Sequence, residues 1–313
     1  MEKLKLITAK TLETKSIPLT NWAIDGIIPE GLSILAGAPK SGKSLLALSM
    51  ALAIASGTEI IGKKNQSIKN VLFLPYEDSE RRLQERIKKI SLGLSIEKNE
   101  RVFFIEEGQI PRLDKNNLNW LKELKDENKI DVIIIDTLGS SIKGIKNKNI
   151  STYLDEYDLL NYFQRFAIDN KISLIFLHHT RKMKADNIFD EISGTRAISG
   201  AADANLILQR NKYFGSLHIQ GRDIEDVQYD LELDKETLTW TCKETSNPVS
   251  LSPEQKSILD VFNQDYEKEL KPSQIAELLG KENQNIRPSF KKLISLGLLH
   301  QDSYGKYKLA YVN

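Results

Sequence analysis

Short apolar runs alternate with longer amphipathic stretches along the N-terminal three quarters of the chain. The runs are Leu32 to Ala36, Val71 to Leu74, Val102 to Ile105, Val132 to Ile135 and Leu174 to Leu177. Runs of this length are typical of strands buried on both faces of a parallel sheet. Between them, apolar residues favour helices over 45–56, 80–90, 114–127 and 152–169, with helical spacing in the last three. The pattern therefore predicts an α/β fold.

After residue 200 the apolar runs become shorter and lie closer together. Strands are predicted over Ala204 to Leu208, Leu217 to Gln220, Tyr229 to Leu233 and Leu238 to Thr241, with the spacing of hairpins. We expect them to extend the mostly parallel sheet with antiparallel edge strands. Residues 183–199 have no periodicity and are predicted to be a loop. Near the N-terminus, Leu4 to Thr8 is predicted to be a short strand.

The last 60 or so residues have a pattern of their own. Residues 242–251 have linker composition, and a helix then begins at Ser252-Pro253, where a capping residue precedes a proline. Further helices are predicted over 273–279 and about 285–296, and a hairpin pairs 298–300 with 306–311. Three helices and a hairpin resemble a winged helix. Its third helix carries a row of polar residues, Asn283, Gln284, Asn285, Arg287, Ser289 and Lys291, with Pro288 expected in its first turn.

Composition limits the classes of protein that the chain can belong to. Among 313 residues, 44 Lys and Arg stand against 43 Asp and Glu, a net charge of +1, so nucleic-acid binding would need local basic patches. A single cysteine, Cys242, excludes an internal disulfide framework. Because no apolar run is long enough to span a bilayer, we expect a cytoplasmic protein without membrane partners.

The first apolar run leads into a phosphate-binding motif. The segment 37–44 fills every position of GxxxxGKS, and a helix-favouring run follows. Glycines let backbone N–H groups close around phosphate oxygens, and the helix directs its positive end at the same anion. Lys43 can reach the β- and γ-phosphates, and Ser44 can hold Mg²⁺. The expected ATP-binding set is Gly37, Ala38, Pro39, Lys40, Ser41, Gly42, Lys43, Ser44 and Leu45.

Two carboxylates follow later strands of the predicted sheet. Glu77 comes just after the run 71–74, where it could orient and deprotonate the water that attacks the γ-phosphate. Its alternative role is that of an acid at a helix start, a role that suits Asp78 better. Asp136 ends the run 132–135, and an acid at this place would hold a water of the Mg²⁺ shell.

The run 174–177 ends in a pair of histidines. His178 and His179 suggest a metal site, but no other His, Cys or acid cluster lies at ligand spacing. A polar residue at this strand end would lie close to the γ-phosphate. We therefore expect His179 to sense whether the phosphate is present.

These motifs occur in a familiar order. The phosphate loop, Glu77, Asp136, the histidine-ended strand and the strands around Arg222 make residues 20–240 resemble RecA-type ATPases, in particular the hexameric replicative helicases of the RepA type from plasmids and phages. The stretches YEDSERRLQERI and LIFLHHTRK carry the resemblance best. It implies a RecA-like ATPase domain over 1–241, a linker over 242–251 and a winged-helix domain over 252–313.

The resemblance also implies an assembly and a DNA path. Such ATPases form rings, in which each nucleotide lies between two subunits and an arginine of the neighbour stabilises transition-state charge. Arg222 is the preferred candidate, ahead of Arg210 and Arg196, and its alternative is a surface ion pair with Asp223. Loops 139–151 and 181–198 correspond to those that line the central channel, and their basic residues suit contact with single-stranded DNA.

Three functions remain in view. The first is a ring-forming helicase that couples ATP hydrolysis to movement along DNA, with the winged helix on duplex DNA or a protein partner. The second is a RecA-type ATPase that binds DNA without unwinding it, in recombination or regulation. The third, a small-molecule phosphotransferase, is disfavoured because no segment resembles a substrate lid.

Overall fold

The computed structural model describes residues 6–64, 67–114, 118–142, 152–181, 188–192, 196–242, 252–263, 269–281, 283–295, 299–301 and 305–309. The chain divides into two compact units, residues 1–246 and 247–313, which are taken separately below. The predicted linker 242–251 begins at Cys242, but this residue pairs with Leu231 as part of the last strand of the first unit.

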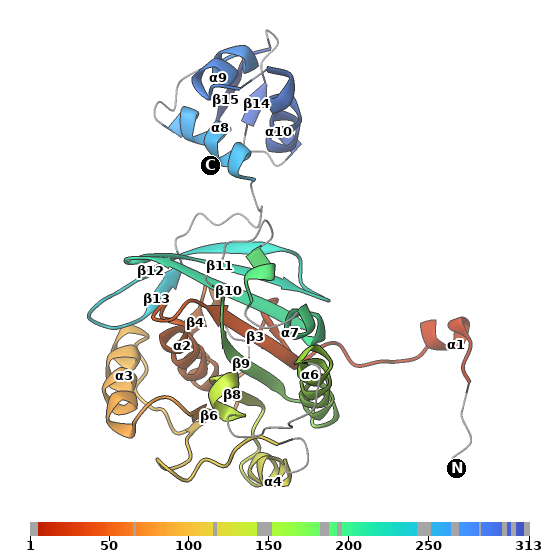
Figure 1. Ribbon diagram of the computed structural model, residues 1–313, viewed down its shortest axis with the longest axis vertical. Coiled ribbons are helices and arrows are strands. Elements are labelled where there is room, and N and C mark those ends of the chain that lie inside the picture. Colours follow the sequence, from red (N-terminus) through yellow and green to blue (C-terminus); the bar gives the residue numbers. More distant parts are fainter. Residues whose placement is uncertain are drawn as a thin grey trace. The chain divides into compact units, whose positions relative to one another are not determined.

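A single large sheet forms the centre of the first unit (Figure 1). In the described residues it has nine strands in the order β13-β12-β11-β10-β3-β9-β8-β6-β7. The parallel strands are β3 (Gly31–Gly37), β6 (Val71–Pro75), β7 (Val102–Phe103), β8 (Val132–Asp136), β9 (Ser173–His179) and β10 (Ala204–Asn211). Antiparallel strands β11 (Phe214–Gly221), β12 (Val227–Leu233) and β13 (Trp240–Cys242) complete one side. This confirms the predicted α/β fold with a mostly parallel sheet.

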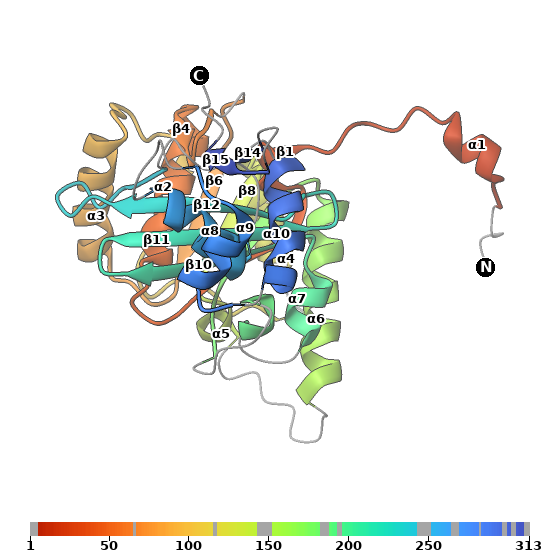
Figure 2. The same ribbon diagram turned by 90° about the horizontal axis from the view of Figure 1, so that it is seen from above.

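Helices cover both faces of this sheet (Figures 1 and 2). Alternate strand residues face opposite sides, so Phe73 packs into the core beneath α2 (Lys43–Ser56) and α3 (Glu80–Gly93). Leu74 belongs instead to the core beneath α4 (Asn119–Glu127), α6 (Thr152–Asp169) and α7 (Arg196–Ala201). With helices on both faces, the strands are apolar throughout, as their continuous runs predicted.

The strand order brings four loops to one edge. β3, β9, β8 and β6 are neighbours, and Gly37 pairs with His179 while Pro75 pairs with Asp136. The phosphate loop, the histidine pair, Asp136 and Glu77 therefore meet at the carboxyl ends of adjacent parallel strands, where such sheets bind ligands.

Several predicted elements differ from those observed. Residues 6–8 form no strand, and Thr8 instead caps α1 (Ala9–Glu13) by accepting a hydrogen bond from the N–H of Thr11. The strand predicted over 102–105 is reduced to β7, and α4 begins at Asn119 rather than near 114. Within the predicted loop 183–199, the described residues include a short 3₁₀ turn, Ile188–Glu191, and the start of α7. Two small hairpins were not predicted, β1 (Trp22–Ile24) with β2 (Ile28–Pro29) and β4 (Glu59–Ile60) with β5 (Lys63–Lys64).

The second unit contains three helices and a hairpin. Its elements are α8 (Pro253–Asn263), α9 (Pro272–Leu278), α10 (Asn283–Ser295), β14 (Leu299–Gln301) and β15 (Tyr307–Leu309). Ile258, Phe262, Ile275 and Phe290 are among the residues that form its own buried core. These elements follow the order from which a winged helix was predicted.

Two expectations for the third helix are wrong. α10 begins at Asn283, so Pro288 lies in its second turn rather than its first. Ser289, expected on the polar face, is 7% exposed and donates a hydrogen bond to Glu254. Arg287 and Lys291 are exposed, so they are the described charged residues of α10 that a partner could reach.

The core between α6 and the sheet gives a stability prediction. Phe163 is fully buried, and its ring meets that of Phe176 edge-on at a centroid distance of 5.0 Å. Phe163→Ala should lower the free energy of unfolding by about 3–5 kcal/mol, because it leaves a cavity. Tyr162→Ala, one residue away and 40% exposed, is the control and should cost less than about 1 kcal/mol. Denaturant unfolding followed by circular dichroism would measure both, and equal losses would contradict this account.

Candidate functional site

The phosphate loop is shaped by glycines at its two ends. A Cβ at Gly37 would lie 2.7 Å from Ser41 Oγ and 2.9 Å from the carbonyl oxygen of Leu208. Gly42 has φ of +92°, in the left-handed region, and stands directly before α2. Close approach at the first glycine and backbone conformation at the second explain why the motif requires them. The resulting loop and helix start have the form that binds phosphate.

Lys43 holds a buried charge at the start of α2. Its side chain is 5% exposed, and its Nζ lies 3.1 Å from Nδ1 of His179. Burial lowers the pKa of Lys43, while Asp136 and Glu77 act in the opposite direction. Burial and the nearby Lys43 charge also lower the pKa of His179, so the ring is neutral near pH 7 and can accept a hydrogen bond from the ammonium. The structure thus links the predicted phosphate-binding lysine directly to the predicted sensor.

Glu77 faces the loop that follows β8. Its Oε1 accepts hydrogen bonds from Thr137 Oγ1 at 2.8 Å and from Ser140 Oγ at 2.6 Å. Burial alone would raise the pKa of Glu77, but these two hydrogen bonds, with His179 and Lys43 nearby, outweigh it and lower the pKa. The carboxylate is therefore ionised and oriented. Neighbouring Asp78 instead forms ion pairs with Arg82 and Arg86 of α3.

Asp136 is buried beside Ser44. Its side chain is 2% exposed and is hydrogen-bonded to Ser44, while its Oδ1 has no hydrogen-bond partner among the residues that the structure describes. Burial is the main cause that raises the pKa of Asp136 to about 6. An orphaned carboxylate oxygen beside a hydroxyl is a donor set that fits Mg²⁺ with part of its water shell. Ser44 and Asp136 would hold this ion, and the phosphate loop would hold the triphosphate.

Arg222 lies beside the amino ends of the parallel strands, whereas Lys43 lies beyond their carboxyl ends. The preceding residue, Gly221, pairs with Ala204 at the start of β10, and Ala204 pairs with Ser33 near the start of β3. The guanidinium is 3.2 Å from Asp203 and not paired with Asp223, the partner suggested as its alternative. Asp203 also accepts hydrogen bonds from the N–H of Leu32 and from Gln164.

The structure describes Arg210 but only parts of the other candidate arginine, Arg196, and of the two predicted DNA loops. Arg210 lies near the phosphate loop, with its guanidinium 5.9 Å from the ring of Trp240. The side chain of Arg196 lies outside the described residues, as do residues 143–151 of the first predicted DNA loop and 182–187 and 193–195 of the second.

Sequence reasoning missed the supports of the site. Trp240, 1% exposed, lies against Gly42, and its Nε1 is 3.4 Å from the carbonyl oxygen of that glycine. No sequence signal indicates this contact, because 198 positions separate the two residues. Thr137 and Ser140 could have been suspected, since they directly follow Asp136 at the predicted ligand edge.

The described residues contain no group of three or more His, Cys, Asp or Glu side chains arranged to hold a metal ion. Nor does any helix in the described ranges have the length and apolar character needed to cross a membrane.

Comparisons with known proteins agree on the fold. A family described as "AAA domain" matches residues 2–185. No curated protein matches the chain. A solved structure described as an ATPase domain is similar, with 16% sequence identity and a TM-score of 0.53 over 69% of this chain and 85% of that one. A DnaB-like replicative helicase, solved to describe its interactions with primase, has 14% identity and a TM-score of 0.54 over 74% and 66% of the two chains. The first unit thus shares its fold with these two solved structures.

The raised pKa of Asp136 predicts a pH-dependent stability. Its pKa is about 6 in the folded protein and near 3.8 otherwise, so a stability contribution present below pH 4 is lost as the pH rises through 6. Asp136→Asn removes this loss, and in metal-free buffer it should gain about 2.5 kcal/mol relative to the parent protein between pH 4 and 7.5. Denaturant unfolding in EDTA at both pH values would measure the difference, and parallel pH profiles would contradict it.

Proposed function

We propose that this chain, which belongs to the AAA domain family, is an ATP-hydrolysing RecA-type motor and acts as a ring-forming DNA helicase in the replication of a plasmid, phage or mobile element. One observation carries the proposal. Lys43, Glu77, Asp136 and His179, far apart in the sequence, come together at one edge of the sheet beside a phosphate loop. Such a motor would act in the cytoplasm, where its DNA and ATP lie.

Each of these side chains has a separate task in hydrolysis. Lys43 binds the β- and γ-phosphates, and Ser44 and Asp136 hold Mg²⁺, which when bound neutralises charge that develops on the phosphate oxygens. Glu77 orients the attacking water, and its lowered pKa keeps it able to accept a proton at neutral pH. When Lys43 turns toward phosphate, its contact with His179 is released, which gives His179 a means of sensing the nucleotide.

A neighbouring copy would complete the site. Arg222 lies at the amino ends of the parallel strands, while Lys43 of the same chain lies at their carboxyl ends. Because Arg222 is at the opposite end from its own phosphate loop, it suits a residue that acts on the nucleotide of the next copy. Its partner Asp203 would hold the guanidinium until the neighbour's nucleotide arrives. In a closed hexameric ring, every copy would give one arginine and receive one.

DNA would pass along loops 139–151 and 181–198, whose basic residues suit backbone phosphates. The second unit, as a winged helix, would contact duplex DNA or a protein partner through exposed Arg287 and Lys291. The alternative function is a RecA-type ATPase that binds DNA without unwinding it. Stimulation of ATP turnover by single-stranded DNA, together with strand displacement from a tailed duplex, would support the helicase. Stimulation without displacement would favour the alternative.

Glu77 provides the sharpest test of the chemistry. Glu77→Gln should bind ATP normally but lower turnover by about 100-fold or more, because the amide cannot accept the proton of the attacking water. Lys43→Ala should lose both binding and turnover. The matched control is Glu85→Gln, on the exposed side of α3, which should behave as the parent protein. A fluorescent ATP analogue and a phosphate-release assay would measure the two steps, and normal turnover in Glu77→Gln would refute the assignment.

Arg222 can be tested by mixing two inactive variants. Arg222→Ala should bind ATP without turnover, and Lys43→Ala should have neither. In mixed rings, some interfaces combine the intact phosphate loop of an Arg222→Ala copy with the intact Arg222 of a Lys43→Ala copy. In an equal mixture about a quarter of the interfaces have this arrangement, so about that share of turnover should return. Arg210→Ala is the comparison variant, and unfolding midpoints would exclude a general loss of structure. If Arg222→Ala alone hydrolyses ATP normally, the role passes to Arg210 or Arg196.

A further inference from the structure

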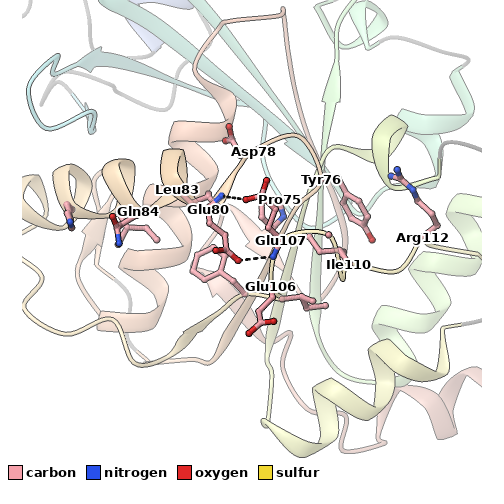
Figure 3. A pocket seen from close by; sticks show the side chains of 15 residues that line it. Pro75, Tyr76, Asp78, Glu80, Leu83, Gln84, Glu106, Glu107, Ile110 and Arg112 are labelled. Carbon is pink, nitrogen blue, oxygen red and sulfur yellow. Dashed lines mark hydrogen bonds between the residues drawn. The ribbon is translucent and has the colours of Figure 1, made fainter.

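A pocket of about 730 Å³ opens beside the strand end that carries Glu77 (Figure 3). A recess of this volume has the size of those that bind small organic molecules. Its lining is largely apolar and includes Pro75, Leu83, Ile87, Phe104, Ile105 and Ile110. Neither Glu77 nor the phosphate loop is among the described residues that line it. The pocket is therefore a site separate from the nucleotide seat.

The polar part of the pocket favours a cation. Asp78 is already paired with arginines of α3. The other charged lining residues are three acids and two cations, namely Glu80, Glu106, Glu107, Lys88 and Arg112. Figure 3 shows Arg112 on the far side of Tyr76 from these acids, and its guanidinium lies 5.6 Å from the centre of that ring. The acids are thus left with one nearby cationic residue of the lining, Lys88.

Glu106 is the acid best placed to bind a positively charged group. It is exposed, it accepts a hydrogen bond from the neutral amide of Gln109, and it belongs to none of the ion pairs of the described residues. Glu80 and Glu107 instead accept hydrogen bonds from each other's backbone N–H, at 2.8 and 3.1 Å. A hydrogen bond from a neutral amide leaves the charge of Glu106 in place, so an ammonium group would be attracted to it.

One side of the pocket is formed by residues 105–113, here called the wall segment, which is fastened at several places. The exchange between Glu80 and Glu107 joins it to the start of α3. Tyr76, after β6, donates a hydrogen bond to the carbonyl oxygen of Pro111 at 2.6 Å. The N–H of Leu113 donates to the carbonyl oxygen of Ser141 at 3.0 Å. Because these bonds form the pocket in advance, a ligand would bind with little ordering of the protein.

The wall segment also reaches the residues that hold Glu77. Ser140 and Ser141 belong to α5 (Leu138–Ser141), the short helix that follows β8. Arg112 of the wall segment donates a hydrogen bond to the carbonyl oxygen of Ser140, and the hydroxyl of Ser140 donates to Glu77. A molecule that fills the pocket would therefore restrain the wall segment and, through α5, the carboxylate of Glu77.

We propose that this pocket binds a small amphipathic cation, an apolar body with one protonated amine, and that this ligand raises ATP turnover. The apolar body lies against the side chains of the floor, and the ammonium group meets Glu106. With the wall segment restrained, Glu77 keeps the orientation that hydrolysis requires. The regulation rests on the proposed function, whereas the binding of the cation does not.

Two probes of opposite charge test the class of ligand. 4-Phenylbutylamine and 4-phenylbutanoate share an apolar body, and their binding to the nucleotide-free full chain can be measured by NMR titration. The amine should bind about fivefold more tightly than the acid, because the acids of the pocket attract one and repel the other. Glu106→Gln should reduce this preference to about twofold, and Glu97→Gln, exposed and outside the pocket, should not change it. Equal affinities of the two probes for the parent protein would overturn the proposal.

Ile110→Trp tests whether the amine binds in this pocket. The larger side chain takes up part of the volume and should weaken binding of 4-phenylbutylamine about tenfold. Ile168→Trp is the same change at a 49% exposed position of α6 and serves as the control, with unfolding midpoints measured for both variants. Unchanged binding to Ile110→Trp would place the amine elsewhere and refute the site. Binding that disappears when copies assemble with a non-hydrolysed ATP analogue would refute it too, since a neighbouring copy would then fill the pocket.

Turnover measurements test the regulation. Saturating 4-phenylbutylamine should raise kcat for ATP about threefold and leave KM unchanged, because the phosphate loop is not part of the pocket. Arg112→Gln should still bind the amine but lose most of the stimulation, since its contact with Ser140 is removed. Lys122→Gln, on exposed α4, is the control and should be stimulated as the parent protein is.

The outcomes separate the inference from the function on which it rests. If the amine binds and kcat stays the same, or if Arg112→Gln is stimulated in full, the proposed regulation is wrong. If the parent protein hydrolyses no ATP with or without the amine, the proposed function fails instead. The NMR titration needs no nucleotide, so it decides the binding site in either case.

Discussion

The buried ammonium of Lys43 is the interaction on which the rest of the site depends. Removing a charge from water is unfavourable unless opposite charges or acceptors lie nearby. Here the neutral ring of His179 accepts from it, and the carboxylates of Asp136 and Glu77 lie close enough to influence its pKa. Each of these groups has its own pKa shifted in turn, so the site is a set of mutually dependent charges and not a row of separate residues. A phosphate entering it meets a cation that is already desolvated.

The parallel sheet makes this convergence possible. Each crossover returns the chain to the same edge, so residues at four strand ends meet although 136 positions separate Lys43 from His179. The same rule lets the sequence predict the candidate site, since each candidate residue follows an apolar run and parallel strands end together. Lys43, Glu77, Asp136 and His179 are therefore expected at one edge from the sequence alone, and they lie there in the structure. The mostly parallel sheet, its antiparallel extension and the helices on both faces follow from the same pattern.

What the sequence did not indicate are contacts that depend on packing. The pairing of Arg222 with Asp203 joins the ends of β10 and β11, and adjacency in sequence favoured Asp223 instead. Pro288 was assigned to a first turn because it lacks an N–H, but α10 begins two residues earlier than the polar pattern suggested. Thr8 belongs to an apolar-rich stretch that suggested a strand, and its side chain caps a helix instead. For Thr8 a local hydrogen bond, and for Arg222 a tertiary contact, outweighed the sequence pattern.

The indole of Trp240 has a mechanical consequence. It lies beneath Gly42, at the turn from which α2 begins, and it belongs to β13, the last described strand of the first unit. A change that displaces this indole would therefore move the backbone at Gly42, although the two residues are 198 positions apart in the sequence. The outermost strand of the antiparallel extension thus fixes the turn between β3 and α2, and the two sides of the sheet depend on each other there.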